Sequence, residues 1–493
     1  MTAQTILPAN SAASGGYDVA NSLRFNDGSS DCLTDTMGTA TNRKIFTHSF
    51  WIKRGILSSG SHHILESHAD ANNRFVIFIH PGDDIRFLDI DGGSVVLDIR
   101  TNAKLRDPSA WYHIVCAVDT TQSTASNRTK IYINGVLQDS FSTNTVYSED
   151  DTPDQGTSSH VHNIGRYGGD SGYFDGYMSE VVFIDGLQLA ADSFGEFDSD
   201  SGIWRPIDVS GLTFGNNGFY LEFKQSGTAT NASGMGADTS GNDHHFAVSN
   251  LTAVDQSTDT CTNNFATLAS GLYTSGATIS QGNLQYQAPG SNPVFGSLTT
   301  IGVDNGKWYA EVKYTAGSSH YLVLGIADEV FATLSNLGSN TNTDLGKVGA
   351  SLSTQAFAQN STVAYVVNTG KVRNNNANGD YGSGGGDGDI IQIALDRDNR
   401  KVYFGINGTY EASGDPGAGS NGFDLSSLVT GDTYFIGVTN DTGASETIAE
   451  FNFGSPSYAI SSSNADANGH GNFEFAVPSG FFALCTKNLA EHG

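Results

Sequence analysis

Three carboxylates alternate along the string Glu196-Phe-Asp198-Ser-Asp200. Alternate residues of a strand lie on one face, so such a string could place a nucleophile beside an acid/base catalyst. A retaining glycoside hydrolase needs two such carboxyl groups about 5–5.5 Å apart, across a groove that holds the sugar. No neighbouring segment supplies that groove, and Ser and Gly surround the string. We therefore predict an exposed acidic turn, no catalytic residues and a chain that is not an enzyme.

Several histidines could hold a metal ion, because imidazole is a common ligand of transition metals. His160-Val-His162 places two imidazoles on one face of a strand, and a trimer of the chain could gather them around one ion. Other histidines lie close together in the sequence: His62, His63, His68, His244 and His245. None has further ligands nearby, so we expect exposed histidines rather than a metal centre.

Aspartates on expected loop edges suggest a second kind of metal site. Calcium binds six to eight oxygen ligands, and Asp170 with Asp175 offers two carboxylates close together in the sequence. Aspartate also favours ordinary turns, so the same residues are compatible with a loop that binds nothing. Similar groups occur elsewhere: Asp83, Asp84, Asp89 and Asp91. We take Asp170 and Asp175 as the candidate calcium ligands and leave both interpretations open.

The segment 374–389 (NNNANGDYGSGGGDGD) is the most glycine-rich loop of the chain. It is either a connector between strands or a recognition loop, in which Gly and Asn adapt while an aromatic ring gives a rigid surface. Tyr381 and Asn378 are its candidate ligand-binding residues. Tyr167 and Tyr173 flank a Gly-Gly-Asp turn and are further candidates, because tyrosine rings can stack on sugar faces.

Charge and hydropathy exclude several classes of protein. The formal net charge is −28, from 24 basic and 52 acidic residues, and such a surface repels nucleic acid. No apolar stretch is long enough to span a membrane. The first residues lack the basic and apolar regions of a signal peptide. The four cysteines lie far apart, so we expect no disulfide framework.

One hairpin pattern occurs twice, at positions far apart in the sequence. Residues 111–119 and 390–396 are apolar, β-branched runs that end in Asp, and each precedes a strand that starts with Lys and closes on Asn-Gly. That dipeptide predicts a type I′ turn, because both of its residues tolerate positive φ. The two copies indicate two related antiparallel domains.

Short apolar runs with period two fill the rest of the chain, and no segment keeps a helical period. The predicted fold class is all-β, with two antiparallel jelly-roll β-sandwiches in tandem. We expect an arm over residues 1–20, a first sandwich over 21–225, a Gly/Ser/Thr/Asn-rich surface connector over 226–280 and a second sandwich over 281–493.

An ordered set of short segments covers most of residues 20–225: Phe50-Trp51-Ile52, Trp111-Tyr112-His113-Ile114-Val115, Lys130–Gly135, Ile164-Gly165 and Phe174-Asp175-Gly176. This set resembles the laminin-G-like, concanavalin A-like jelly rolls. A second ordered set follows later: Gly306-Lys307-Trp308-Tyr309, Glu311-Val312, the hairpin from Leu395-Asp396 to Asn407-Gly408, and Pro478-Ser479-Gly480-Phe481. This second set looks like a SPRY domain. The resemblances imply two binding modules, one for glycans, calcium or proteins and one for proteins.

The linker SGNDHHFAVSNLTAVDQSTD, the C-terminal CTKNLAE and the domain order are similar to virion proteins of tailed bacteriophages. That resemblance implies a lectin-like host-attachment component (fibre, spike or capsid appendage), made in the host cytoplasm and released by lysis. Its partners would be host surface glycans or proteins, other virion proteins and further copies of itself, with a trimer favoured. A structural capsid or tail decoration and a jelly-roll glycan hydrolase remain as alternatives. No cofactor other than the calcium considered above is implied.

Overall fold

The computed structural model describes residues 16–57, 60–269, 277–289, 296–316, 322–329, 362–374, 377–426, 432–440 and 446–493. Strands make up nearly all of the regular structure, and the two α-helices in these ranges are short: α1 Ala125–Arg128 and α3 Thr486–His492. No helix in the described ranges is long and apolar enough to cross a membrane. The chain divides into two compact units between Asn264 and Phe265. The predicted all-β class is confirmed.

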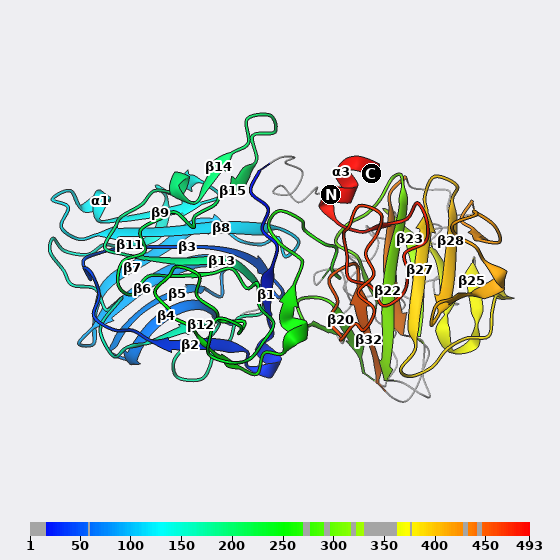
Figure 1. Cartoon of the computed structure of the whole chain (residues 1–493), viewed down its shortest axis with the longest axis horizontal. Coiled ribbons are helices and arrows are strands. Elements are labelled where there is room, and N and C mark those ends of the chain that lie inside the picture. The colour runs from blue at the N-terminus through cyan, green and yellow to red at the C-terminus, as the bar shows by residue number, and fades with distance from the viewer. Residues whose placement is uncertain are drawn as a thin grey trace. The chain divides into compact units, whose positions relative to one another are not determined.

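The first unit contains two large antiparallel sheets (Figure 1). We call the first the β3 sheet; its strands in spatial order are β10 Val136–Leu137, β9 Thr129–Ile133, β8 Trp111–Asp119, β3 Ile45–Arg54, β13 Gly176–Asp185, β1 Ser22–Phe25 and β18 Gln256–Ser257, with β16 Phe219–Leu221 paired to β13. The second, the β5 sheet, has the order β11 Phe141–Thr145, β7 Ser94–Lys104, β6 Asp84–Asp91, β5 Asn73–Ile79, β4 His62–Asp70, β12 Val161–Ile164, β2 Cys32–Thr36 and β17 Ala247–Ser249. A small hairpin is formed by β14 Gly195–Phe197 and β15 Trp204–Pro206.

The β3 sheet buries apolar side chains on both of its faces. Phe50 and Ile52 of β3 belong to the core between the two sheets. Trp51, between them in sequence, points to the other face because side chains alternate along a strand, and it packs in a separate buried cluster with Phe194 and Trp204. The segment after β13 therefore covers the outer face of the β3 sheet.

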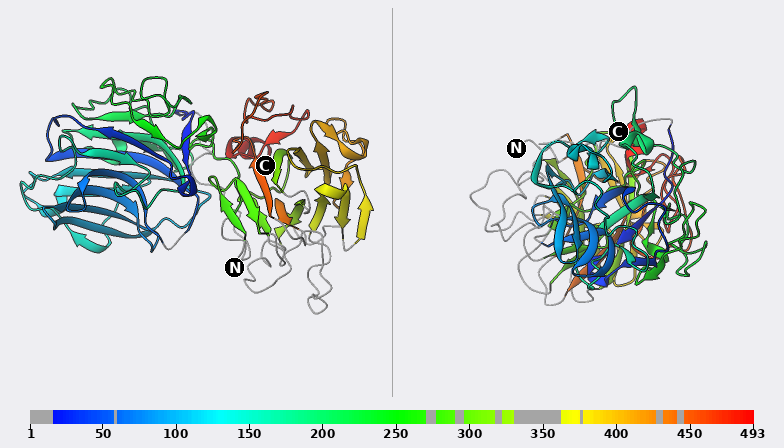
Figure 2. Two further views of the ribbon diagram at one scale, coloured as in Figure 1. Left: turned by 90° about the horizontal axis from the view of Figure 1, so that it is seen from below. Right: turned by 90° about the vertical axis from the view of Figure 1, so that its left-hand side faces the viewer.

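The second unit has the same two-sheet construction (Figure 2). One sheet has the order β19 Thr278–Ser280, β20 Gln285–Ala288, β32 Thr447–Asn452, β22 Lys307–Ala316, β27 Ile390–Asp396, β28 Lys401–Ile406 and β29 Thr409–Tyr410, with β30 Phe423–Asp424 on β28 and β33 Phe482–Ala483 on β22. The other has the order β21 Gly296–Leu298, β31 Tyr434–Asn440, β23 Leu322–Asp328, β24 Thr362–Val366, β25 Lys371–Asn374 and β26 Ala377–Asp380.

The repeated hairpin occupies matching positions in the two units. The strand order β13-β3-β8-β9-β10 of the first unit corresponds to β32-β22-β27-β28-β29 of the second. Asn134 and Asn407 both have φ of +47°, and the glycines that follow them have φ of +79° and +86°. Each Asn side chain also accepts a backbone hydrogen bond from the neighbouring strand, from His113 N at 2.8 Å and from Ile390 N at 3.0 Å. Both predicted Asn-Gly turns are confirmed.

The expected connector over residues 226–280 differs from the structure. Its part up to Asn264 belongs to the first unit, where β17 and β18 each extend a sheet. Phe246 and Leu251 of this segment lie in the core between the sheets. Its apolar residues are few and scattered among Gly, Ser and Asn, so strand signals in the sequence are few, yet Phe246 and Leu251 bury their side chains against the sandwich.

The expected N-terminal arm also differs in its described part. Val19 is buried, and the Tyr17 hydroxyl lies 3.1 Å from the hydroxyl of Tyr220 in β16. The first unit therefore begins before residue 21. Residues 1–15 lie outside the described ranges.

Replacing Gly135 with Val is expected to lower the free energy of unfolding by about 1 kcal/mol or more, because a β-branched residue is strained at positive φ. A Cβ at Gly135 would also lie 2.3 Å from Cε3 of Trp204. The control is Gly202→Val, since Gly202 has φ of +69° and no atom within 4 Å of its Cβ position. Urea unfolding followed by tryptophan fluorescence measures both variants. Equal losses would show that the Trp204 contact adds nothing.

Candidate functional site

The outer face of the β5 sheet carries an unusual set of side chains. Phe75, Ile77 and Ile79 of β5 belong to the core between the sheets, so the residues between them point outward. Val76 and Phe78 form a small separate apolar cluster there. Polar and aromatic side chains surround that cluster and make the candidate site, which we call the Tyr167 cluster: Tyr167, His63, Glu66, His68, Arg74 and Phe78.

Tyr167 reaches this face from the turn after β12. Its backbone N–H donates to Ser171 O at 2.9 Å, and Asp170 N donates back to Tyr167 O at 3.0 Å, which closes the turn. The half-buried ring lies 5.3 Å from the His63 ring and 5.5 Å from the His68 ring, measured between centroids. The Arg74 guanidinium carbon lies 4.8 Å from the centre of the Tyr167 ring, within the range of a cation–π contact.

Two glycines allow the Tyr167 turn to lie flat on the sheet. A Cβ at Gly168 would be 2.4 Å from Nδ1 of His68, and a Cβ at Gly169 would be 2.7 Å from the Tyr167 ring. A side chain at position 168 would therefore push the turn off β4, and one at position 169 would displace the Tyr167 ring. The Gly-Gly pair fixes the height of the ring above the sheet.

Glu66 is a buried carboxyl group within the cluster. One oxygen, Oε2, accepts a hydrogen bond from Gly168 N at 2.5 Å. The other, Oε1, is buried without a hydrogen-bond partner among the described residues. Burial raises the pKa of Glu66 from 4.5 to about 7, although the Gly168 bond and the nearby Arg74 and Arg166 act in the opposite direction. Glu66 was not among the residues predicted from the sequence, where it is one of many acids.

The histidines of the cluster are held neutral. His63 stacks on Phe78 with ring centroids 4.9 Å apart, and burial lowers its pKa to about 3. Burial also lowers the pKa of His68, with nearby Arg74 acting in the same direction. Neutral imidazoles and the tyrosine ring thus form a largely aromatic surface beside the Arg74 guanidinium, and Arg86 lies over the Phe78 ring at 5.7 Å. Of these residues, Tyr167 was predicted as a ligand-binding residue, and the two histidines were expected to be exposed.

Tyr381 does not stand out from a loop as the sequence suggested. Its ring packs against the core of the second unit, 6.1 Å from Phe404 and 6.2 Å from Phe423 between centroids. Burial raises its pKa to about 12. The segment begins as the hairpin of β25 and β26, in which Asn378 pairs with Arg373. An aromatic ring loses more water-accessible apolar area when it packs on the core than when it stands above a glycine-rich loop. This explains why Tyr381 is packed on the core rather than projecting from the loop.

Tyr173, a further predicted ligand-binding residue, lies in the segment before β13. It is half-buried, and its backbone carbonyl accepts a hydrogen bond from Nδ1 of His62 at 3.0 Å. The residue therefore helps to hold the segment before β13 against β4.

Asp170 and Asp175, the candidate calcium ligands, lie in different environments. Asp170 is exposed and bound to Arg166 through an ion pair. Asp175 is buried, and burial together with the nearby Asp27 raises its pKa to about 8. No group of three or more His, Cys, Asp or Glu side chains in the described ranges could hold a metal ion.

The predicted exposure of the His160-Val-His162 pair is wrong. Both side chains are buried, and the pKa of His162 is held well below its usual value by burial. His162 lies 5.8 Å from Phe183 between ring centroids, within the sandwich. The polar sequence around the pair gave no sign that β12 would be a central strand.

The carboxylate string is held as part of the β14–β15 hairpin. Arg205 binds Glu196 at 2.8 Å and Asp198 at 2.8 Å. Asp198 also accepts bonds from the backbone and hydroxyl of Ser201. These bonds lower its pKa, with the Ser201 backbone bond as the largest cause. Arg205 thus occupies the space that a sugar would need between the two acids.

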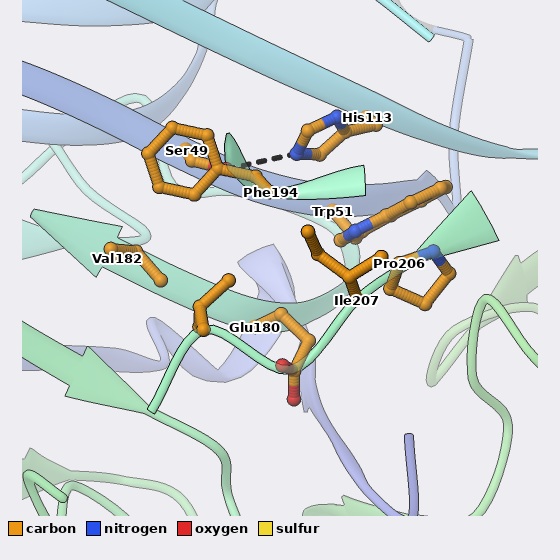
Figure 3. A pocket seen from close by; sticks show the side chains of 9 residues that line it. Ser49, Trp51, His113, Glu180, Val182, Phe194, Pro206 and Ile207 are labelled. Atoms are coloured by element: carbon orange, nitrogen blue, oxygen red, sulfur yellow. Dashed lines mark hydrogen bonds between the residues drawn. The ribbon is translucent and has the colours of Figure 1, made fainter. Parts of the chain in front are cut away.

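A small pocket under the cover of the β3 sheet contains a serine–histidine pair (Figure 3). His113 Nε2 lies 2.8 Å from Ser49 Oγ, and Trp204 Nε1 donates to His113 Nδ1 at 3.0 Å. Since Nδ1 accepts from the indole, the proton of the neutral ring is on Nε2, which donates to Ser49. This is the wrong tautomer for a base that takes a proton from serine. The pocket has room for about one water molecule, too little for a sugar.

The carboxyl group of Glu180 in this pocket points away from the serine–histidine pair (Figure 3). It accepts a hydrogen bond from the Tyr220 hydroxyl, and burial raises its pKa to about 8. Glu180 has φ of +50° at an irregularity of β13, which turns its side chain toward Tyr220. Glu180 therefore helps to hold Tyr220 in the packing on the outer face of the β3 sheet.

Comparison with known proteins places a concanavalin A-like domain in the first unit. Residues 26–191 match the family model of the concanavalin A-like lectin/glucanases superfamily. These residues include every member of the Tyr167 cluster. The predicted jelly-roll fold of the first unit is confirmed. The superfamily name covers both lectins and glucanases, so the match does not distinguish binding from hydrolysis.

Similar solved structures have low identity to this chain, and no curated protein sequence matches it. The SPRY domain of human HERC1 is 13% identical, with 37% of this chain and 96% of that chain covered and a TM-score of 0.27. A heptameric SAP-like pentraxin from Limulus polyphemus is 15% identical, with coverages of 36% and 80% and a TM-score of 0.27. A candidate carbohydrate-binding protein from Bacteroides ovatus is 14% identical, with coverages of 48% and 61% and a TM-score of 0.32.

Glu66→Gln is expected to change how stability depends on pH. The folded-state pKa of about 7 lies above the usual 4.5, so the stabilising contribution is full below pH 4.5 and is lost as the pH rises through 7. The variant does not titrate, so it should gain stability relative to the wild type between about pH 5 and about pH 8, by up to about 3 kcal/mol. Urea unfolding at both pH values measures this. A difference between the two proteins that stays constant with pH would contradict it.

Proposed function

We propose that this chain is a non-enzymatic, lectin-like binding protein whose first unit binds glycans through the Tyr167 cluster. The observation that carries the proposal is the Tyr167 ring, held half-buried over the outer face of the β5 sheet within the segment that matches the lectin/glucanase model. Tyrosine combines an apolar ring with a polar hydroxyl and suits the faces of sugars. The pairing of Arg205 with Glu196 and Asp198 supports the absence of catalysis by that string.

Tyr167→Ala is expected to weaken binding to a recognised polysaccharide by about 1–2 kcal/mol, because the variant loses the ring that stacks on the sugar. Titration calorimetry against a panel of neutral and acidic polysaccharides measures the affinity. The matched control is Tyr381→Ala, which removes a ring from the core of the second unit and should lower thermal stability without changing affinity. Unchanged affinity in Tyr167→Ala, or a loss in Tyr381→Ala, would refute this site.

A glycan hydrolase is the second candidate, and Glu66 is the observation that favours it. A carboxyl group with a pKa of about 7 beside a sugar-binding ring could donate a proton to a leaving group. A retaining or inverting mechanism also needs a second carboxylate across the sugar. Release of reducing sugar by the purified protein, abolished in Glu66→Gln, would place this candidate first.

We further propose that the chain acts in a bacteriophage virion, as a host-attachment component that forms a homo-oligomer, with a trimer favoured. The support is the resemblance of its linker, C-terminus and domain order to virion proteins of tailed phages. Particles that lack the chain should fail to adsorb to host cells. Normal adsorption by such particles would favour the alternative of a structural decoration.

A further inference from the structure

Arg74 is exceptional among the arginines of the first unit. Every other arginine there has a carboxylate oxygen within 4.0 Å in the described ranges. Arg74 has none among the described residues, and its Nε is buried without a hydrogen-bond partner there. The chain carries 52 acidic residues against 24 basic ones, so a carboxylate partner would have been easy to supply. Because carboxylates are abundant in this protein, we look outside the described residues for the group that pairs with the Arg74 guanidinium.

Glu66 is a carboxyl group near Arg74, but the two form no ion pair. It acts on Arg74 through space but lies beyond the 4.0 Å of an ion pair. Its Oε2 is used by Gly168 N, and its burial keeps much of the group protonated near neutral pH. A protonated carboxyl group can donate a hydrogen bond, and Oε1 is buried without a partner among the described residues. The two groups together therefore offer donors and a positive charge.

We propose that Arg74 binds the acid group of an anionic glycan whose ring lies against Tyr167. The inference rests on the proposed lectin-like function and names its ligand class. The guanidinium presents a planar set of donors that matches a carboxylate or a sulfate ester, and the Tyr167 ring lies 4.8 Å from its central carbon. An acidic sugar can thus contact the ring with its apolar face and the guanidinium with its acid group. The neutral His63 and His68 complete the apolar rim of this site.

The overall charge of the chain does not prevent this interaction. Repulsion from the net charge of −28 acts at long range and is screened beyond about 8 Å at physiological ionic strength. The contact with Arg74 is short-range and half-buried, so salt weakens it less. The acidic surface then acts against weak, non-specific binding of anionic polymers, while one position accepts an acid group.

Three soluble polymers test the ligand class on the full chain: polygalacturonate, which carries carboxylates, dextran sulfate, which carries sulfate esters, and neutral dextran. The wild type should bind at least one anionic polymer more tightly than dextran. Arg74→Gln should weaken that binding by about tenfold or more, because hydrogen bonds to charged groups are the strong ones. The control Arg106→Gln changes the net charge equally at an exposed arginine paired with Asp83, and should leave affinity nearly unchanged.

Each outcome of this experiment has a separate meaning. The anionic polymer that loses affinity in Arg74→Gln identifies a carboxylate or a sulfate as the acid group. Equal losses of affinity in Arg74→Gln and Arg106→Gln would show that only the net charge matters, which would overturn the inference. Binding of dextran alone, unchanged by Arg74→Gln, would overturn the inference and leave glycan binding intact. Failure of the folded wild type to bind any polymer in this set would count against both the inference and the proposed function.

Discussion

The apolar outer face of the β3 sheet is the constraint on which the first unit depends. Antiparallel sheets commonly leave one face to water, but here Trp51, Trp111 and Tyr177 must be covered on the side away from the sandwich core. The chain after β13 covers them, and Lys53 binds Asp259 at 2.7 Å in a fully buried ion pair at the end of this layer. One sheet is therefore enclosed on both faces. The proposed ligand site lies on the outer face of the other sheet, the β5 sheet.

The same Asn-Gly turn occurs in both units, and in each the residues that the turn conformation requires are also the ones that the packing requires. The Asn of each Asn-Gly turn accepts a backbone hydrogen bond from the neighbouring strand that precedes it, while the Gly lies against an aromatic ring. That ring is Trp204 in the first unit and Phe475 in the second. A residue with a Cβ would be strained by its φ and would meet the ring. Backbone conformation and tertiary packing thus select the same residue type.

Most arginine side chains of the first unit form ion pairs with nearby carboxylates. Nearly every arginine has its own carboxylate, and Asp84, fully buried, is shared between Arg100 and Lys104. Such pairing limits the cost of burying charge, since each ion keeps a partner in place of water. Against this background Arg74 is the exception, since no carboxylate oxygen among the described residues lies within 4.0 Å of its guanidinium, and this supports the ligand site proposed there.

Local patterns in the sequence were enough to predict the all-β class, the two repeated hairpins and the Asn-Gly turns, because strand alternation and positive φ are local requirements. The sequence also predicted Tyr167 as a ligand-binding residue, but not that Arg74 and Glu66 lie beside it. Arg74 and Glu66 gave no signal, since single charges are common in polar strands. The tertiary structure alone decided that Tyr381 is packed on the core and that Asp170 and Asp175 lie in different environments. It brings Tyr167 to His63, His68 and Arg74 because β12 pairs with β4 and β4 with β5, and such long-range pairing depends on which distant faces can bury each other.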